Sequence, residues 1–195
     1  PMMLNESLES YDRDAAINYA LNWYNKYNPN FSPSRDCANF VSQCLEAGGF
    51  QMNEYWHCQT RNQEKLNPLF RLFNKYSDWS YTPAWSAAED QYEYLKNSNI
   101  VTGETILSSI QDISIAINDA ENPVKVGDIM YLKWDKPYPH HATIISKIKG
   151  DMIHFAAHTD PYDKKPLSIF FNDNKNGIAY ILKIGEFYEK ISMNI

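Results

Sequence analysis

The sequence has few cysteines, no long apolar run and no cluster of positive charge. Three cysteines in 195 residues are too few for a disulfide framework. No apolar run approaches the ~18 residues of a membrane span, and no signal peptide is visible. A formal net charge of −6 without a Lys/Arg stripe argues against general nucleic-acid binding.

The composition indicates a globular protein. Hydrophobic residues make up 44% of the chain and charged residues 22%, which suits one domain with a full-sized core. We therefore predict a single domain over residues 1–195, with 1–10 a cloning remnant or a disordered lead-in. Aromatic residues reach 14%, which favours either a groove for sugars or peptides or simply a Tyr-rich core and surface.

Residues 35–49 predict a helix that begins at or next to Cys37. Five residues recur with helical spacing and share one face: Cys37, Phe40, Val41, Cys44 and Leu45. The glycines at 48 and 49 end the helix. A cysteine at a helix N-terminus lies among unpaired N–H groups that favour a thiolate. Cys37 is therefore a candidate nucleophile, with a small core residue as the alternative.

Motifs over about residues 11–167 match a known pattern. They are Tyr11-Asp12-Arg13, Ala15-Ala16, Tyr19-Ala20, Trp23, Tyr27-Asn28-Pro29, Asp36-Cys37, Asn39-Phe40-Val41-Ser42-Gln43-Cys44, Gly48-Gly49, Trp85, Gly127-Asp128-Ile129, His141-Ala142 and His158-Thr159. Together they resemble the bacterial "putative amidase domain", a relative of the CHAP and NlpC-type cell-wall amidases and endopeptidases with the papain-like fold. The resemblance implies peptidoglycan as substrate, cut between glycan and stem peptide or within the stem. It also implies an extracellular or wall-associated enzyme. A cysteine mechanism needs no cofactor, and we expect a monomer.

The order of patterns predicts helices first and an antiparallel sheet second, an α+β layout. Helices are predicted over 11–27, with Asp12 as N-cap, and over 85–96, whereas 108–118 fits helix or strand. Residues 50–81 indicate loops with a short helix near 63–76. Period-two runs predict strands over 127–134, 142–148, 152–158, 167–171 and 177–184. The papain-like resemblance implies the same order, with the nucleophile helix packed on the sheet that carries the histidine.

A histidine at the start of the second predicted strand is the candidate general base. His141 is preferred to His140 because the family pattern places the histidine directly before a small residue, here Ala142. Two exposed loop histidines are one alternative. A metal site is another, although no spacing resembles a zinc site; its ligands would be His140, His141, His154, His158 and Asp160.

A third group is expected to fix the tautomer of His141. If Lys149-Gly150 form the hairpin turn, His141 lies opposite His158; if Gly150-Asp151 form it, His141 lies opposite Asp160 and diagonal to His158. His158 is thus the predicted third residue and Asp160 the reserve. The NlpC-type relatives, in which this residue is often histidine, agree.

An oxyanion hole would use the backbone N–H of Cys37 and a second donor from the upstream loop. Tyr27, Asn28 and Asn30 are candidates by position, and Asp36 is predicted to cap the helix. Four residues are predicted to line the substrate groove: Trp56, Trp79, Trp85 and His154. The alternative for each is core packing or a structural role. A Cys44–Cys58 bridge is possible but not expected.

Two other functions stay open. A papain-like cysteine also supports acyl transfer, deamidation or proteolysis of a protein substrate. A wall-binding module with vestigial catalytic residues is the second, and the intact set of Cys37, His141 and His158 argues against it.

Overall fold

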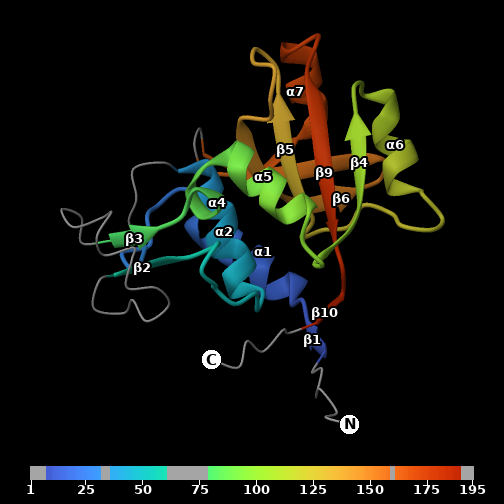
Figure 1. Ribbon diagram of the computed structural model, residues 1–195. Helices are drawn as coiled ribbons and strands as arrows, with labels where there is room; N and C mark the ends of the chain where they lie inside the picture. Colours follow the sequence, from blue (N-terminus) through green and yellow to red (C-terminus); the bar gives the residue numbers. More distant parts are fainter. Residues whose placement is uncertain (1–7, 32–35, 61–78, 159–160, 190–195) are drawn as a thin grey trace.

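A six-stranded antiparallel sheet forms the centre of the molecule (Figure 1). The computed structural model describes residues 8–31, 36–60, 79–158 and 161–189. The sheet order is β4-β9-β5-β6-β7-β8, with the strands β4 Val101–Leu107, β5 Ile129–Lys133, β6 His141–Lys149, β7 Met152–Ala157, β8 Tyr162–Pro166 and β9 Ile178–Ile184. The described helices are α1 Arg13–Trp23, α2 Cys37–Ala47, α4 Pro83–Ser86, α5 Ala88–Lys96, α6 Gln111–Ile117 and α7 Leu167–Asp173.

Helices cover both faces of the sheet. Because side chains alternate across each strand, the sheet contributes to two cores. The first lies beneath α1, α2, α4 and α5 and includes Tyr131, Ala142 and Ile144. The second lies beneath α6 and α7 and includes Leu132 and Phe155. The predicted α+β layout is confirmed.

Helices α1 and α2 form largely as predicted. The carboxylate of Asp12 accepts the N–H of Ala15 at 2.9 Å and caps α1, which relieves one unpaired donor of the first turn. The helix ends at Trp23, so its predicted extension to 27 is wrong; Tyr27 is 73% exposed. Helix α2 begins at Cys37 and packs against α1.

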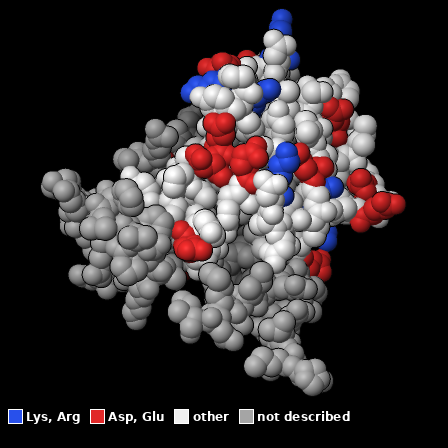
Figure 2. Space-filling view, viewed as in Figure 1, with Lys and Arg blue, Asp and Glu red and all other residues white. Residues whose placement is uncertain are grey.

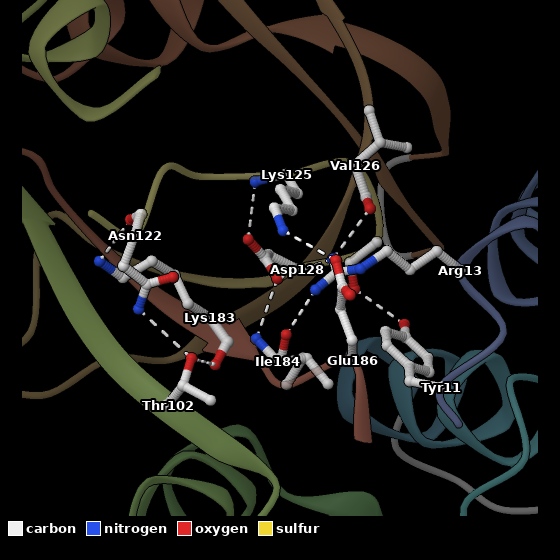
Figure 3. A network of polar contacts seen from close by, with 11 residues as sticks. Tyr11, Arg13, Thr102, Asn122, Lys125, Val126, Asp128, Lys183, Ile184 and Glu186 are labelled. Atoms are coloured by element: carbon white, nitrogen blue, oxygen red, sulfur yellow. Dashed lines mark hydrogen bonds and ion pairs between the residues drawn. The ribbon is translucent and has the colours of Figure 1, made fainter. Parts of the chain in front are cut away.

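A buried polar network joins α1 to the sheet (Figure 3). Arg13 donates to the carboxylate of Asp128 at 2.9 Å, to the carbonyl of Val126 at 3.0 Å and to the carbonyl of Ile184. Gly127 has φ +94°, and a Cβ there would lie 3.2 Å from the Arg13 side chain, so glycine fits best. The motifs at 11–13 and 127–129 therefore contribute to the fold.

Other predicted elements differ from the structure. The helix predicted over 85–96 is two helices, because Ala87 is extended (φ −115°, ψ 128°) between α4 and α5. The strand predicted over 167–171 is wrong: Leu167, Phe170 and Phe171 share one buried face of α7. Strands β4 and β8 were not predicted, and 111–117 is helical. The helix predicted near 63–76 lies outside the described residues.

Two short strand pairs complete the described structure. Strand β1 (Leu8–Ser10) pairs with β10 (Phe187–Glu189), so residues 8–10 take part in the described fold. Strand β2 (Cys58–Thr60) pairs with β3 (Trp79–Tyr81). All three cysteines are free thiols. Within the described ranges, no helix has the length and apolarity to cross a membrane.

Candidate active site

Helix α2 packs against strands β6 and β7. The thiol of Cys37 lies close enough to the backbone N–H of Ala142 on β6 for that group to act on the pKa of the thiol. The preceding residue, Asp36, accepts a hydrogen bond from His158, which directly follows β7. Asp36 is thus held by the residue that follows β7, and Cys37 adjoins the peptide bond between His141 and Ala142 on β6.

A bulge in the β6–β7 hairpin decides which face each histidine occupies. The turn is Gly150-Asp151, but a bulge after Ile145 shifts the register by one residue. Such a shift moves side chains to the other face of a strand. His158 consequently faces α2 and stacks on Phe40 at 5.3 Å. His141 is paired with Leu132, on the side of the second core.

Both ring nitrogens of His158 are occupied. Nδ1 donates to the Asp36 carboxylate, and Nε2 donates to the carbonyl of Lys26 at 2.7 Å. Burial acts to lower the pKa of His158, but Asp36 and the carbonyls of Lys26 and Trp23 outweigh it and raise the pKa above 6.5. The prediction that His158 orients His141 is wrong, because the ring has no nitrogen left for it.

Asp36 also differs from its predicted role. It occupies the N-cap position of α2, but its side chain makes no capping hydrogen bond. The carboxylate turns instead to His158 and, at 3.5 Å, to the hydroxyl of Tyr27. The ring of Tyr27 meets that of His158 edge-on at 4.6 Å. The pair of Asp36 and His158 therefore anchors the start of α2 from outside the helix.

The thiol of Cys37 is not a resting thiolate in this environment. Burial raises its pKa above the ordinary 9.0; the N–H groups of Ala142 and Ala38 act in the opposite direction, and the Asp36 carboxylate adds to the rise. The first-turn N–H groups favour the anion as predicted, but burial outweighs them. The thiol must therefore lose its proton to a base during attack.

His141 and its neighbour His140 have different surroundings. His140 precedes β6, and its ring contacts the Asp135 carboxylate at 3.2 Å and the Tyr138 carbonyl at 3.2 Å. His141 is the first residue of β6, directly before the N–H that contacts the thiol. The loop thus engages the His140 ring. The backbone between His141 and Ala142 adjoins the thiol, whereas the His141 ring faces the second core.

The loop before α2 uses most of the predicted oxyanion donors itself. The Asn28 amide donates to the hydroxyl of Tyr19 at 3.0 Å, and its oxygen accepts the N–H of Asn30 at 3.0 Å. Tyr27 contacts Asp36. The N–H of Cys37 belongs to the first turn, whose N–H groups have no intrahelical partner, and stays the best-placed predicted donor.

A buried glutamine, missed in the sequence, holds α2 from behind. Gln91 on α5 donates to the carbonyl of Ala38 at 2.8 Å and to the hydroxyl of Ser42 at 2.7 Å. Its oxygen accepts the hydroxyl of Tyr131 on β5 at 2.7 Å. Gln91 is a single polar residue among the apolar residues of a helical stripe, and the sequence has no feature that predicts its hydrogen bonds to α2. The network fixes the turn that follows the nucleophile.

Two of the predicted groove tryptophans belong to the core. Trp56 is 3% and Trp85 0% exposed. Their indole N–H groups donate to Ser42 at 2.9 Å and Asn39 at 2.8 Å, so they support α2 and do not line a groove. Trp79 is half-buried on β3.

A cavity of about 350 Å³ lies beside His141. Its lining comprises Leu132, Trp134, His141, Phe155, Tyr162, Lys165, Phe170 and Asn174. The predicted groove residue His154 does not line it; burial and the nearby Lys147 lower the pKa of His154. In the described part of the chain, no three His, Cys, Asp or Glu side chains are grouped to hold a metal ion. Asp160 lies outside the described residues.

The face in Figure 2 carries charges of both signs. Acidic side chains gather over α5, where Glu89, Asp90 and Glu93 are exposed and Lys96 lies in the last turn. The described residues present no continuous basic stripe on this face, and acidic groups would repel a phosphate backbone.

Comparison with known proteins identifies relatives. A family model described as "Putative amidase domain" matches residues 10–182. "Uncharacterized protein YhbB" of Bacillus subtilis (strain 168) is 30% identical over 145 residues, which cover 73% of this chain and 39% of that protein. The match thus spans less than half of YhbB. No solved structure matches the chain.

Proposed function

Because the chain belongs to the "Putative amidase domain" family, we propose that it is a cysteine amidohydrolase with Cys37 as nucleophile and His141 as general base and acid. One observation carries the proposal: helix α2, which begins at Cys37, packs against strand β6, which begins at His141. Nucleophilic acyl transfer requires the base within hydrogen-bond reach of the thiol, so the His141 ring, which faces the second core, must turn toward Cys37 for the proton transfer.

The reaction divides into two halves. His141 takes the thiol proton while the sulfur attacks the amide carbon, and the oxyanion is held by the N–H of Cys37. The C–N bond then breaks, and His141 gives the proton to the leaving amine. Water attacks the thioester, loses a proton to His141, and the acid and the thiol are released. Because the thiol pKa is raised, deprotonation accompanies attack.

Asp36 and His158 act in this proposal as positioning residues. They hold the start of α2 between β6 and β7, so the sulfur keeps its place beside Ala142. The tautomer of His141 needs another partner, and Asp160 stays the predicted one.

The fold and the substrate class extend the proposal. A nucleophile helix packed on an antiparallel sheet that carries the histidine supports a papain-like fold. The family resemblance supports peptidoglycan amides as substrate, between glycan and stem peptide or within the stem. The enzyme would then act outside the cell or at the wall, as a monomer without cofactor.

Mass spectrometry of products released from purified peptidoglycan tests the function. The native protein should release soluble peptides or muropeptides, and the new amine end names the bond that is cut. Cys37→Ala should release none while it keeps the native circular dichroism spectrum. Equal release by both proteins would exclude Cys37 as the nucleophile. No release from several wall types would exclude peptidoglycan.

A further inference from the structure

The cavity beside His141 has the dimensions and lining of a ligand site. Its volume of about 350 Å³ falls at the small end of the range of ligand pockets. Leu132, Phe155 and Phe170 provide apolar walls from the second core, and Trp134, 38% exposed, contributes an aromatic edge. Apolar walls with few polar groups bind small ligands in a defined orientation. A fragment of one or two amino acids fits this size better than a polymer.

The described lining carries a positive charge. In a chain with net charge −6, the residues that the structure describes around this cavity include Lys165 and no acidic side chain. The Lys165 ammonium lies 4.1 Å from the centre of the Tyr162 ring. This cation–π contact holds the charge at the cavity. A carboxylate is the complementary ligand group.

The position of His141 relates the cavity to the reaction. Its ring lines the cavity, whereas Cys37 does not. In the reaction above, the leaving nitrogen must approach the His141 ring to receive its proton, so its substituent extends toward the space that the ring lines. The acyl part stays bonded to Cys37 on the side of α2.

We propose that this cavity binds the amine-side part of the substrate and that Lys165 recognises a carboxylate on it. The inference rests on the proposed function, since it assigns His141 the role of proton donor. The enzyme would accordingly prefer amides whose leaving part is a short, partly apolar peptide with a free carboxylate.

Binding of product-like dipeptides tests the site without catalysis. Ala-Leu and its C-terminal amide are titrated into ¹⁵N-labelled protein, and amide shifts are followed by NMR. Ala-Leu should shift residues that line the cavity, and the amide should bind about tenfold more weakly because a charge-assisted contact is lost. Lys165→Met should remove this preference and Lys165→Arg should keep it. The matched control is Lys164→Met, because Lys164 is exposed on the same strand and absent from the lining.

The outcomes separate the site from the reaction. Equal binding of acid and amide would overturn the carboxylate assignment, and shifts confined to another surface would overturn the cavity assignment. The same spectra report whether each variant is folded. Cys37→Ala should bind like the native protein, so a failed peptidoglycan digest leaves the binding result intact. If the enzyme digests peptidoglycan but the dipeptides do not bind in the cavity, this inference is refuted and the proposed function is not.

Discussion

Replacing Asp128 by Asn removes the centre of the anchor between α1 and the sheet. The carboxylate is 1% exposed and accepts three hydrogen bonds, from Arg13 at 2.9 Å, the N–H of Ile184 at 2.9 Å and the N–H of Lys125 at 2.8 Å. Asparagine leaves the guanidinium without its counter-charge and turns an NH₂ group toward a donor. Removing one member of a buried ion pair costs about 3–5 kcal/mol. That is a large part of the ~5–15 kcal/mol by which domains are stable.

Thermal unfolding followed by circular dichroism measures this cost. One kcal/mol corresponds to about 2–4 °C for a domain of this size, so Asp128→Asn should lower Tm by roughly 6–20 °C. Glu186→Gln is the matched control, because the ion pair of Lys125 and Glu186 has a similar distance, 3.0 Å against 2.9 Å, but its side chains are 44% and 65% exposed. It should change Tm by less than about 2 °C. Equal shifts for both variants would refute the structural role of Asp128.

Three further predictions concern the surroundings of α2. Asp36 helps to raise the pKa of His158 above 6.5, so the pair stabilises the fold fully below pH 6.5 and less as the pH rises through the raised pKa. Asp36→Asn should therefore flatten this part of the pH profile of Tm. An unchanged pH profile would contradict the role of the pair. Iodoacetamide should label Cys37 in the resting protein only as the pH approaches or exceeds 9.0. Intact-mass measurements over a pH series give the midpoint of labelling, and Asp36→Asn should move this midpoint to lower pH. A native midpoint near pH ~6–7, typical of an activated cysteine, would refute the raised pKa. Gln91→Leu leaves the buried hydroxyl of Tyr131 and the carbonyl of Ala38 without their partner, so urea unfolding should give a loss of about 2–4 kcal/mol; a loss below ~1 kcal/mol would contradict the network.

Local signals explain what the sequence could predict. Helix α2 combines apolar residues at helical spacing with a glycine stop, and both act within a few residues of Cys37. The choice of His141 used one further local feature, the small Ala142. These signals depend only on neighbouring residues along the chain, so they can be interpreted without the tertiary structure.

Contacts between distant segments explain what the sequence could not predict. Asp36 and His158 lie 122 positions apart, and one bulge after Ile145 decides which face His158 occupies. Hairpin geometry alone gives the turn but not the bulge. The apolar run at 167–171 fits helix or strand equally, and only packing against β7 and β8 selects the helix. The cavity depends on residues from five elements at once, β5, β6, β7, β8 and α7 with the residues that adjoin them.

The rates of peptidoglycan digestion by His141→Ala and His140→Ala test the central claim most directly. The two histidines are adjacent, and each ring lies near Trp134, so general effects on the fold should be similar. The account predicts that His141→Ala slows release by about 10²–10⁴-fold, as expected for loss of a general acid and base, while His140→Ala stays within about tenfold of the native rate. Near-native release by His141→Ala, or a loss confined to His140→Ala, would contradict it.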